Sequence, residues 1–187
     1  FRELLVRWFQ FGAFCPVMRL HGDRLPTTPV RAADGSHRSP TGGPNEVWSY
    51  GDAVSPILER YLFAREALRP YTREVMRDAH VDGQPVLRGL FHEFPGDERC
   101  WSVKDQYLFG PDLLVAPVME AGARSRRVVL PAGAQWTDLW TGEVFAGGGE
   151  VEVDAPLDRI PVFVRDGAAS EVVAALRAAL SAAAPHA

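Results

Sequence analysis

The pattern of apolar and polar residues predicts a helical first part. Over residues 2–11, apolar side chains recur at three- and four-residue spacings, as in an amphipathic helix. The predicted apolar face consists of Leu4, Leu5, Trp8 and Phe9. Polar side chains, Arg7 and Gln10 among them, are expected on the remaining surface. Gly12 is expected to end this helix.

Residues 13–19 predict a short strand that soon becomes a loop. Phe14, Val17 and Met18 form an apolar run of strand length, while Pro16 lacks the N–H that a central strand needs. Residues 22–51 follow without any periodicity and are rich in Pro, Gly, Thr and Ser. A stretch of this length is either a functional loop or disordered.

Residues 53–80 carry the longest helical pattern in the chain. Asp52 is expected to cap its N-terminus, because a carboxylate can accept the free N–H groups there. Pro70 removes a helical hydrogen bond and clashes with the preceding turn, so we expect a kink or break near Arg69. Gly83 is the expected stop.

After Gly83 the chain consists of short apolar runs separated by turn residues. The alternation in "EVEV" at 150–153 is typical of a half-buried strand, and "TGE" at 141–143 and "GGG" at 147–149 are placed as hairpin turns. We therefore expect an antiparallel β-sandwich or meander over about 84–166. Residues 170–183 predict a short, loosely docked terminal helix.

Composition excludes several classes of partner. The net charge of −4 gives no basic surface for nucleic acid, and no apolar run is long enough to cross a membrane. The two cysteines, Cys15 and Cys100, are far apart and are expected to be reduced, buried thiols. With no visible signal peptide, we expect a cytoplasmic protein. A homo-oligomer is left open.

The first 82 residues are too few for a closed α/β core of their own. One helix, one strand and one further helical stretch leave apolar faces without neighbours, and an eight-fold barrel takes roughly 250 residues. The chain opens at Phe1 inside a helical pattern. We therefore expect it to be the C-terminal end of something larger.

Several ordered motifs then resemble glycoside hydrolase family 31, the α-glucosidase and α-xylosidase family. The segment "RWFQFGAFCPVMRLHGD" resembles a barrel segment of that family, and "EVWSYGD" resembles a second motif with Val47 in place of the usual Pro. The likeness continues through "LRPYTREVMRDAHVDGQPVLRGLFHEFPGDE" and "DQYLFGPDLLVAPVMEAGARSRRVVLPAGAQWTDLWTGEVF". It covers about residues 1–168. The matching positions of the first motif are Arg7, Trp8, Gln10, Gly12, Ala13, Phe14, Pro16, Arg19 and His21.

The resemblance implies a fold of α/β plus all-β type. Residues 1–82 would be the C-terminal end of a (β/α)8 TIM barrel, residues 83–167 an antiparallel β-sandwich, and residues 168–187 a helical or disordered tail. The parent would be a retaining α-glycosidase that hydrolyses terminal α-linked xylose or glucose.

The resemblance also implies where the site residues lie. The two catalytic Asp residues of the family fall in barrel segments before Phe1, so no catalytic residue is carried over and this chain alone is expected to be inactive. His21 maps onto a histidine that hydrogen-bonds sugar hydroxyls, and Arg19 is its neighbour in the motif. The implied partner is a carbohydrate substrate, with no metal and no organic cofactor.

Other interpretations of these residues stay open. His21 without the family motif is an ordinary loop histidine, and with Asp23 and His37 it makes no compact metal site. Asp97 and Glu98 are expected in a solvated turn rather than as a catalytic pair. Three tryptophans are expected in the core or, alternatively, on a sugar-stacking surface: Trp101, Trp136 and Trp140. The rival functions are a non-catalytic carbohydrate-binding module and a structural β-sandwich.

Overall fold

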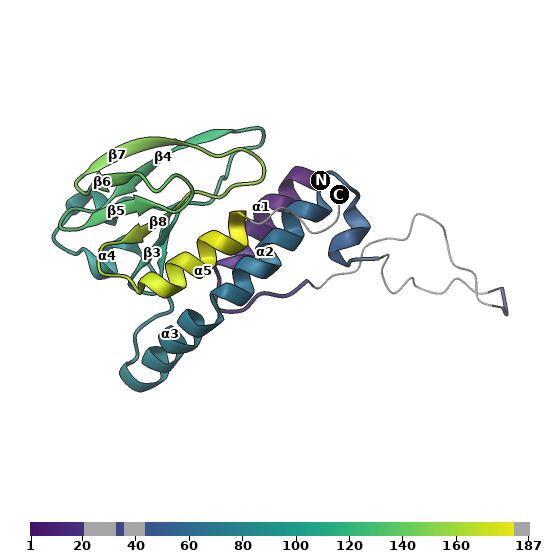
Figure 1. Cartoon of the computed structure of the whole chain (residues 1–187), viewed down its shortest axis with the longest axis horizontal. Helices are drawn as coiled ribbons and strands as arrows, with labels where there is room; N and C mark the ends of the chain where they lie inside the picture. The colour runs from purple at the N-terminus through teal and green to yellow at the C-terminus, as the bar shows by residue number, and fades with distance from the viewer. Residues whose placement is uncertain (21–32, 36–43, 182–187) are drawn as a thin grey trace.

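The computed structural model describes residues 1–20, 33–35 and 44–181, and within them it places helices beside antiparallel sheets (Figure 1). The helical elements are α1 (Arg2–Ala13), the 3-10 turn η1 (Val47–Tyr50), α2 (Ser55–Ala67), α3 (Arg69–Asp82), α4 (Leu90–Glu93), the 3-10 turn η2 (Glu98–Trp101) and α5 (Ser170–Ser181). The strands are β1 (Leu87–Arg88), β2 (Tyr107–Phe109), β3 (Leu113–Val115), β4 (Ser125–Leu130), β5 (Gln135–Asp138), β6 (Val144–Ala146), β7 (Gly149–Asp154) and β8 (Val162–Arg165). No helix in the described ranges is both long and apolar enough to cross a membrane.

The long helical pattern breaks where the proline predicts. α2 ends at Ala67 and α3 begins at Arg69, with Leu68 between them and Pro70 in the first turn of α3. Pro is tolerated there because the first-turn N–H would have no intrahelical partner. α3 ends at Gly83, whose φ of +70° is left-handed, a conformation that glycine adopts at little cost. Both boundaries are confirmed.

Two predictions for the helical part are wrong. Asp52 does not cap α2: the N–H groups of Val54 and Ser55 bond the carbonyl of Gly51, so Asp52 lies in a turn before the helix. Residues 13–19 do not form a strand either. α1 continues to Ala13, and the N–H groups of Phe14 and Cys15 still bond helical carbonyls, so the chain leaves through a turn. No strand occurs among the described residues before Leu87.

Six strands form one antiparallel sheet in the order β1-β2-β3-β8-β5-β6, and β4 and β7 form a second, two-stranded sheet. In the register of the first sheet, Leu113 pairs with Val164 and Val115 pairs with Val162. The predicted alternation in β7 is observed, since Glu150 and Glu152 are exposed and the valines between and after them are partly buried. The antiparallel character expected for this part of the chain is confirmed.

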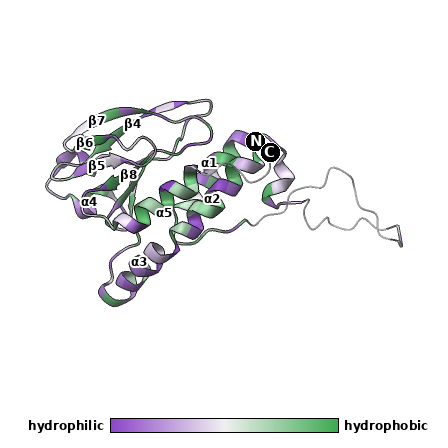
Figure 2. Ribbon diagram, in the orientation of Figure 1, coloured by the Kyte–Doolittle hydropathy of each residue, from purple (hydrophilic) through white to green (hydrophobic). Residues whose placement is uncertain are grey.

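The six-stranded sheet has a separate apolar cluster on each face. Alternate side chains of a strand point to opposite faces, so every residue of β3 is buried. On one face, residues such as Leu113 and Val162 join the apolar sides of α1, α2, α3 and α5. On the other face, Leu114 and Trp136 pack with Val128 of β4. The helices α1, α2, α3 and α5 therefore cover one face, and the β4–β7 pair, together with α4 and η2, covers the other (Figures 1 and 2).

The two predicted hairpin turns have different outcomes. Gly142 lies in the turn that joins β5 to β6, closed by hydrogen bonds between Asp138 and Glu143 and between Gly142 and Asp138. The glycines at 147–149 do not make a hairpin, because β6 pairs with β5 and β7 pairs with β4. They let the chain pass between sheets: a Cβ on Gly147 would lie 2.0 Å from the carbonyl oxygen of Pro131.

The terminal helix is docked on α2, which corrects the expectation of a loose tail. Leu176 and Leu180 are buried in the cluster shared with the helices. The Arg177 guanidinium donates to the carbonyls of Leu139 (3.1 Å) and Asp138 (3.2 Å). α5 is therefore part of the fold as far as Ser181.

Candidate functional site

Of the two predicted substrate-binding residues, Arg19 lies near the end of the segment that leaves α1, residues 14–19, which we call the exit segment. Phe14 and Cys15 are buried at its start, and Arg19 is exposed near its end. His21 lies outside the described residues. The predicted sugar contacts of Arg19 and His21 therefore stay predictions.

Side chains from two other elements bind the carbonyls at the start of the exit segment. The Arg65 guanidinium of α2 donates to the carbonyls of Ala13 (3.1 Å), Cys15 and Pro16 (2.7 Å). The Tyr107 hydroxyl of β2 donates to the carbonyl of Phe14 at 3.0 Å. Burial lowers the pKa of Arg65 and raises that of Tyr107. Both groups keep their protons at neutral pH and can act only as donors to these carbonyls.

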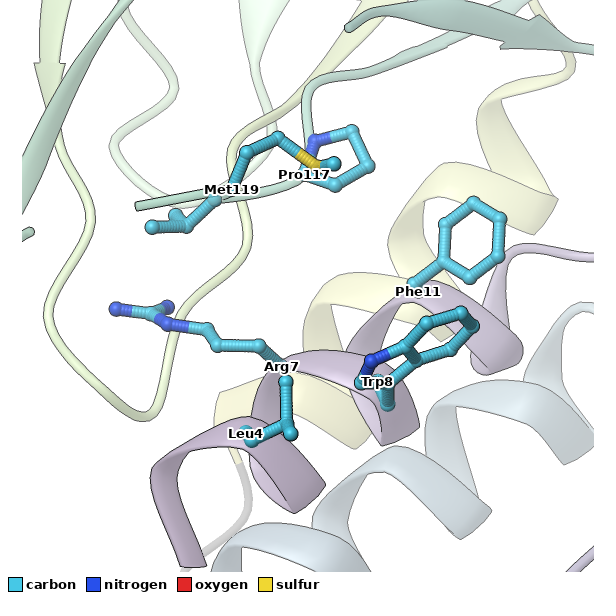
Figure 3. Close-up of a pocket in the computed structure, with 7 residues that line it drawn as sticks. Leu4, Arg7, Trp8, Phe11, Pro117 and Met119 are labelled. Carbon is cyan, nitrogen blue, oxygen red and sulfur yellow. The ribbon is translucent and has the colours of Figure 1, made fainter. Parts of the chain in front are cut away.

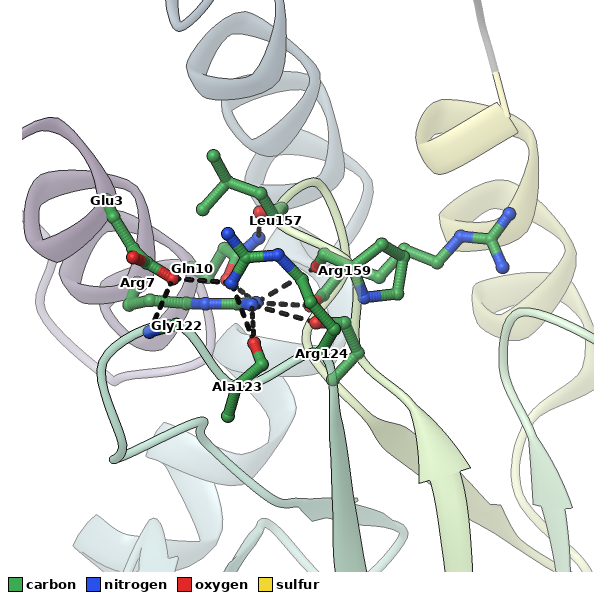
Figure 4. Close-up of polar contacts among 10 residues, drawn as sticks. Glu3, Arg7, Gln10, Gly122, Ala123, Arg124, Leu157 and Arg159 are labelled. Atoms are coloured by element: carbon green, nitrogen blue, oxygen red, sulfur yellow. Dashed lines mark hydrogen bonds and ion pairs between the residues drawn. The ribbon is translucent and has the colours of Figure 1, made fainter.

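The first motif also contributes a polar joint between α1 and the chain before β8 (Figure 4). The Arg7 guanidinium donates to four backbone carbonyls: Arg159 (2.8 Å), Ala155 (2.8 Å), Pro156 (3.1 Å) and Ala123 (3.2 Å). The Gln10 amide donates to the carbonyl of Leu157 at 2.8 Å. Arg7 and Gln10 are only 8% and 1% exposed.

This joint corrects the predicted orientation of α1. Arg7 and Gln10 face the interior, whereas Leu4 and Trp8 of the predicted apolar face are exposed. Burial lowers the pKa of Arg7, and its acceptors are backbone carbonyls, so the joint is structural. No feature of the local pattern indicated it, because the acceptors are 116 to 152 residues away in the sequence.

A shallow apolar groove lies beside this joint (Figure 3). Leu4, Trp8 and Phe11 of α1 face Pro117 and Met119, and the enclosed volume is about 190 Å³. Arg7 also lines the groove, but its guanidinium already donates to backbone carbonyls, and the other lining side chains are mainly apolar, whereas a sugar needs hydrogen-bonding groups to be oriented. The groove is therefore suited to an apolar side chain or segment rather than to a sugar.

The prediction of a solvated turn at 97–98 is wrong for Asp97, whose side chain is only 8% exposed, whereas Glu98 is exposed as expected. Asp97 accepts hydrogen bonds from the N–H groups of Arg99 (3.2 Å) and Ala132 (2.9 Å) and forms an ion pair with the Arg99 guanidinium at 2.8 Å. The hydrogen bonds from Arg99 and Ala132 lower the pKa of Asp97 to about 2. Asp97 thus ties η2 to the start of the β4–β5 turn, while Glu98 is exposed.

No group of three or more His, Cys, Asp or Glu side chains in the described ranges is placed to hold a metal ion. Asp23 and His37, the two residues weighed with His21 as ligands, lie outside those ranges. Cys15 and Cys100 are free, buried thiols, as predicted, and burial raises the pKa of both.

The three tryptophans differ in burial. Trp136 is fully buried, and Trp140 is partly buried with its indole N–H bonded to the carbonyl of Ile160 at 2.7 Å. Trp101 is 60% exposed and stacks on the exposed ring of Phe91, with centroids 5.1 Å apart. The prediction of a core position is confirmed for Trp136 and wrong for Trp101.

Comparison with known proteins assigns both parts of the chain to one family. Residues 1–74 match the family model for the "glycosyl hydrolases family 31 TIM-barrel domain", and residues 83–169 match the "glycosyl hydrolase family 31 C-terminal domain". The chain is 35% identical to α-glucosidase 2 of Bacillus thermoamyloliquefaciens and 33% identical to an α-xylosidase of Saccharolobus solfataricus. These matches cover 89% and 90% of this chain but only 19% and 20% of the enzymes, so the chain spans about a fifth of their length.

A solved structure gives the same assignment. The crystal structure of a family 31 α-xylosidase from a soil metagenome, in complex with xylose, superimposes with a TM-score of 0.86 at 52% identity. The superposition covers 94% of this chain and 26% of that enzyme. The barrel-end and C-terminal-domain matches, in the order found in the chain, show that this protein belongs to glycoside hydrolase family 31.

Proposed function

We propose that the chain forms the end of the barrel and the adjoining domain of a retaining α-glycosidase that removes terminal α-linked xylose or glucose. The observation that carries the proposal is the 52% identity, at a TM-score of 0.86, to an α-xylosidase that was solved with xylose. Because some relatives are α-glucosidases, glucose is the alternative sugar in this proposal. In this proposal the two catalytic carboxylates come from barrel segments outside this sequence.

The chain's own contribution to the site is the exit segment. We propose that Arg19 and His21 line the sugar pocket, because both match the family motif and Arg19 lies at the exposed end of a segment whose start is firmly held. A neutral imidazole offers one donor and one acceptor, which suits a sugar hydroxyl. Arg19 would orient the imidazole or pair with a carboxylate of the pocket.

The proposal assigns a supporting role to the remaining chain. Residues 1–82 would complete the barrel, residues 83–167 would form the β-sandwich, and the tail from residue 168 would cover α2. The two antiparallel sheets with an apolar cluster between them support a sandwich. The Arg7 joint supports its attachment to the barrel, because α1 and the chain before β8 share four hydrogen bonds, and a fifth joins Arg7 to the carbonyl of Ala123 before β4.

A carbohydrate-binding module is the second candidate, and one observation favours it. Trp101 and Phe91 form an exposed aromatic pair on α4 and η2, and aromatic faces are a common support for sugar rings. Trp136 is in the core, so these two rings are not continued into a row by that tryptophan. This candidate predicts sugar affinity without hydrolysis.

The test compares two proteins: the product of the complete open reading frame that contains the codon for Phe1, and the 187-residue chain alone. We expect the first to hydrolyse para-nitrophenyl α-xyloside or α-glucoside, with the α-anomer of the sugar released first, as double displacement requires. We expect the chain alone to be inactive. Hydrolysis by the chain alone, or none by the complete product, would contradict the proposal.

A further inference from the structure

We infer that Arg65 and Tyr107 are positioning residues for sugar binding, which act by fixing the exit segment that carries Arg19. The inference deepens the proposed function and rests on it. Neither residue is placed to touch a sugar in this interpretation: each binds backbone carbonyls three to six residues before Arg19.

The end of α1 needs such partners. The last carbonyls of an α-helix have no intrahelical donor and must be satisfied by other groups. Here Arg65 binds the carbonyl of Ala13, the last residue of α1. Arg65 and Tyr107 together also bind the carbonyls of the next three residues, Phe14 to Pro16, which follow the helix. The cationic guanidinium also lies at the negative end of the helix dipole, which favours it further. The direction in which the chain leaves α1 is thus set by α2 and β2.

The arginine side chain at position 65 can bind all three of these carbonyls at once, whereas a lysine side chain could not. Its planar guanidinium donates through both terminal nitrogens, so it can bond three carbonyls that point in different directions. Its side chain is partly buried, and burial lowers its pKa without removing its charge. The lysine ammonium group, on a flexible side chain, would keep the charge but lose the fixed, planar arrangement of N–H donors.

Through Tyr107, the β part of the chain also binds the carbonyls of the exit segment. Its hydroxyl donates to the carbonyl of Phe14 at 3.0 Å, and its ring packs edge-on against Phe11 of α1 at 5.7 Å between centroids. Burial of the hydroxyl makes a lost partner costly, since a buried donor or acceptor without a hydrogen bond is strongly unfavourable. The domain outside the barrel therefore helps to hold a segment of the sugar site.

The remaining exit segment offers little freedom between this contact and Arg19. Pro16 has a fixed φ, and Met18 packs on the apolar cluster beside Gly12. Arg19 follows Met18 directly. A change in the orientation of the Phe14–Pro16 carbonyls is thus passed on to Arg19 through a short, constrained stretch.

The test uses Tyr107→Phe, which removes one hydroxyl, and Arg65→Lys, which keeps the charge. The control is Tyr71→Phe, on α3 away from the exit segment, which loses a hydroxyl bond to a β2 carbonyl (Phe109, 2.8 Å) and the bond that this hydroxyl accepts from the N–H of Asp112 (3.2 Å). In the product of the complete open reading frame, we expect KM for the para-nitrophenyl glycoside to rise about 2- to 10-fold in Tyr107→Phe and more in Arg65→Lys, the range that one to two lost hydrogen bonds give. Tyr71→Phe should leave KM unchanged while it lowers thermal stability at least as much as Tyr107→Phe does, because its hydroxyl makes two hydrogen bonds.

Two further readouts separate positioning from stability. Amide exchange in the 187-residue chain should accelerate at Phe14 and Cys15, whose N–H groups close the last turns of α1, in the two test variants and not in the control. In a double-mutant cycle with Arg19→Ala, the KM effect of Tyr107→Phe should largely vanish. Unchanged KM, fully additive effects or unchanged exchange in the test variants would each overturn the inference. Absence of turnover by the unmutated complete product would instead reject the proposed function, and the positioning role with it.

Discussion

The helical part, residues 1–82, and the β part, residues 83–167, bury their apolar side chains to different extents. In the β part, β3 and β8 are covered on both faces, and the largest aromatic side chain, Trp136, is fully buried. In the helical part, α1 and α2 bury one side each against the sheet and α5 but leave other large apolar side chains exposed. Over residues 1–82 as a whole, the exposed large apolar side chains include Phe1, Leu4, Trp8, Val17, Trp48 and Phe63. They are fewer in the β part, where they include Phe91, Trp101, Met119 and Val144. The β part thus has its own core, whereas the helical part has a surface that suits further protein.

The largest expected effect is on the β core. Trp136→Ala should lower the free energy of unfolding by about 3–5 kcal/mol, because it leaves a large cavity and removes the bond from its indole N–H to the carbonyl of Pro131. Trp8→Ala, at a residue that is 64% exposed in the helical part, should change it by less than about 0.5 kcal/mol. Urea unfolding of the chain measures both. If both variants lost the same free energy of unfolding, the claimed difference in burial between the β part and the helical part would be contradicted.

The joint between the parts is expected to contribute nearly as much. Arg7→Met should cost about 3 kcal/mol, because the buried carbonyls of Ala155 and Arg159 lose their donor. Arg2→Met is the matched control on the same helix. Arg2 is exposed, and its side chain donates one hydrogen bond, to the carbonyl of Tyr50. Its effect should stay below about 1 kcal/mol. If the two variants unfold at the same urea concentration, the joint does not hold the parts together.

A third prediction separates the parts by function. In the product of the complete open reading frame, His21→Ala should lower kcat/KM about 5- to 150-fold, equivalent to roughly 1–3 kcal/mol, through loss of a buried hydrogen bond to the sugar. His92→Ala changes an exposed histidine of the β part, whose imidazole is 3.2 Å from the side-chain oxygen of Gln84. It should leave kcat/KM unchanged. A His21→Ala enzyme with unaltered kcat/KM would remove His21 from the site.

The smallest predicted effect tests a local contact within the β part. Asp97→Asn should cost about 1 kcal/mol at neutral pH, since it weakens the cap of η2 and the ion pair with Arg99. The folded pKa of about 2 lies below the ordinary 3.8, so this stability is present above pH 4 and is lost as the pH falls toward 2. The difference in unfolding free energy between the original and variant chains should therefore shrink over that range. Glu98→Gln, at an exposed neighbour, should show no such pH dependence.

Local signals were sufficient for much of the fold. Pro70 and Gly83 marked the break and the end of the long helices, and the alternation at 150–153 marked a half-buried strand, because each depends on backbone conformation or on one exposed face. The family resemblance gave the order of the two parts. These predictions needed no knowledge of distant contacts.

The errors arose where distant contacts decide the structure. Residues 13–19 looked like a strand, but their carbonyls are bound by Arg65 and Tyr107 from α2 and β2. Arg7 and Gln10 looked like surface residues, but their carbonyl partners are those of Ala123 and of residues 155–159, far along the chain. The motif that carries the resemblance contains these two residues, yet its spacing says nothing of the carbonyls that they bind.

The most direct test of the central claim measures tryptophan oxidation by hydroxyl-radical footprinting in two proteins, the 187-residue chain and the product of its complete open reading frame. Trp8 of the helical part and Trp101 of the β part are similarly exposed in the chain, at 64% and 60%. We predict that Trp8 is protected in the complete product, where the rest of the barrel covers α1, while Trp101 reacts equally in both. Equal reactivity of Trp8 in the two proteins would contradict the claim that the helical part is completed by a larger barrel.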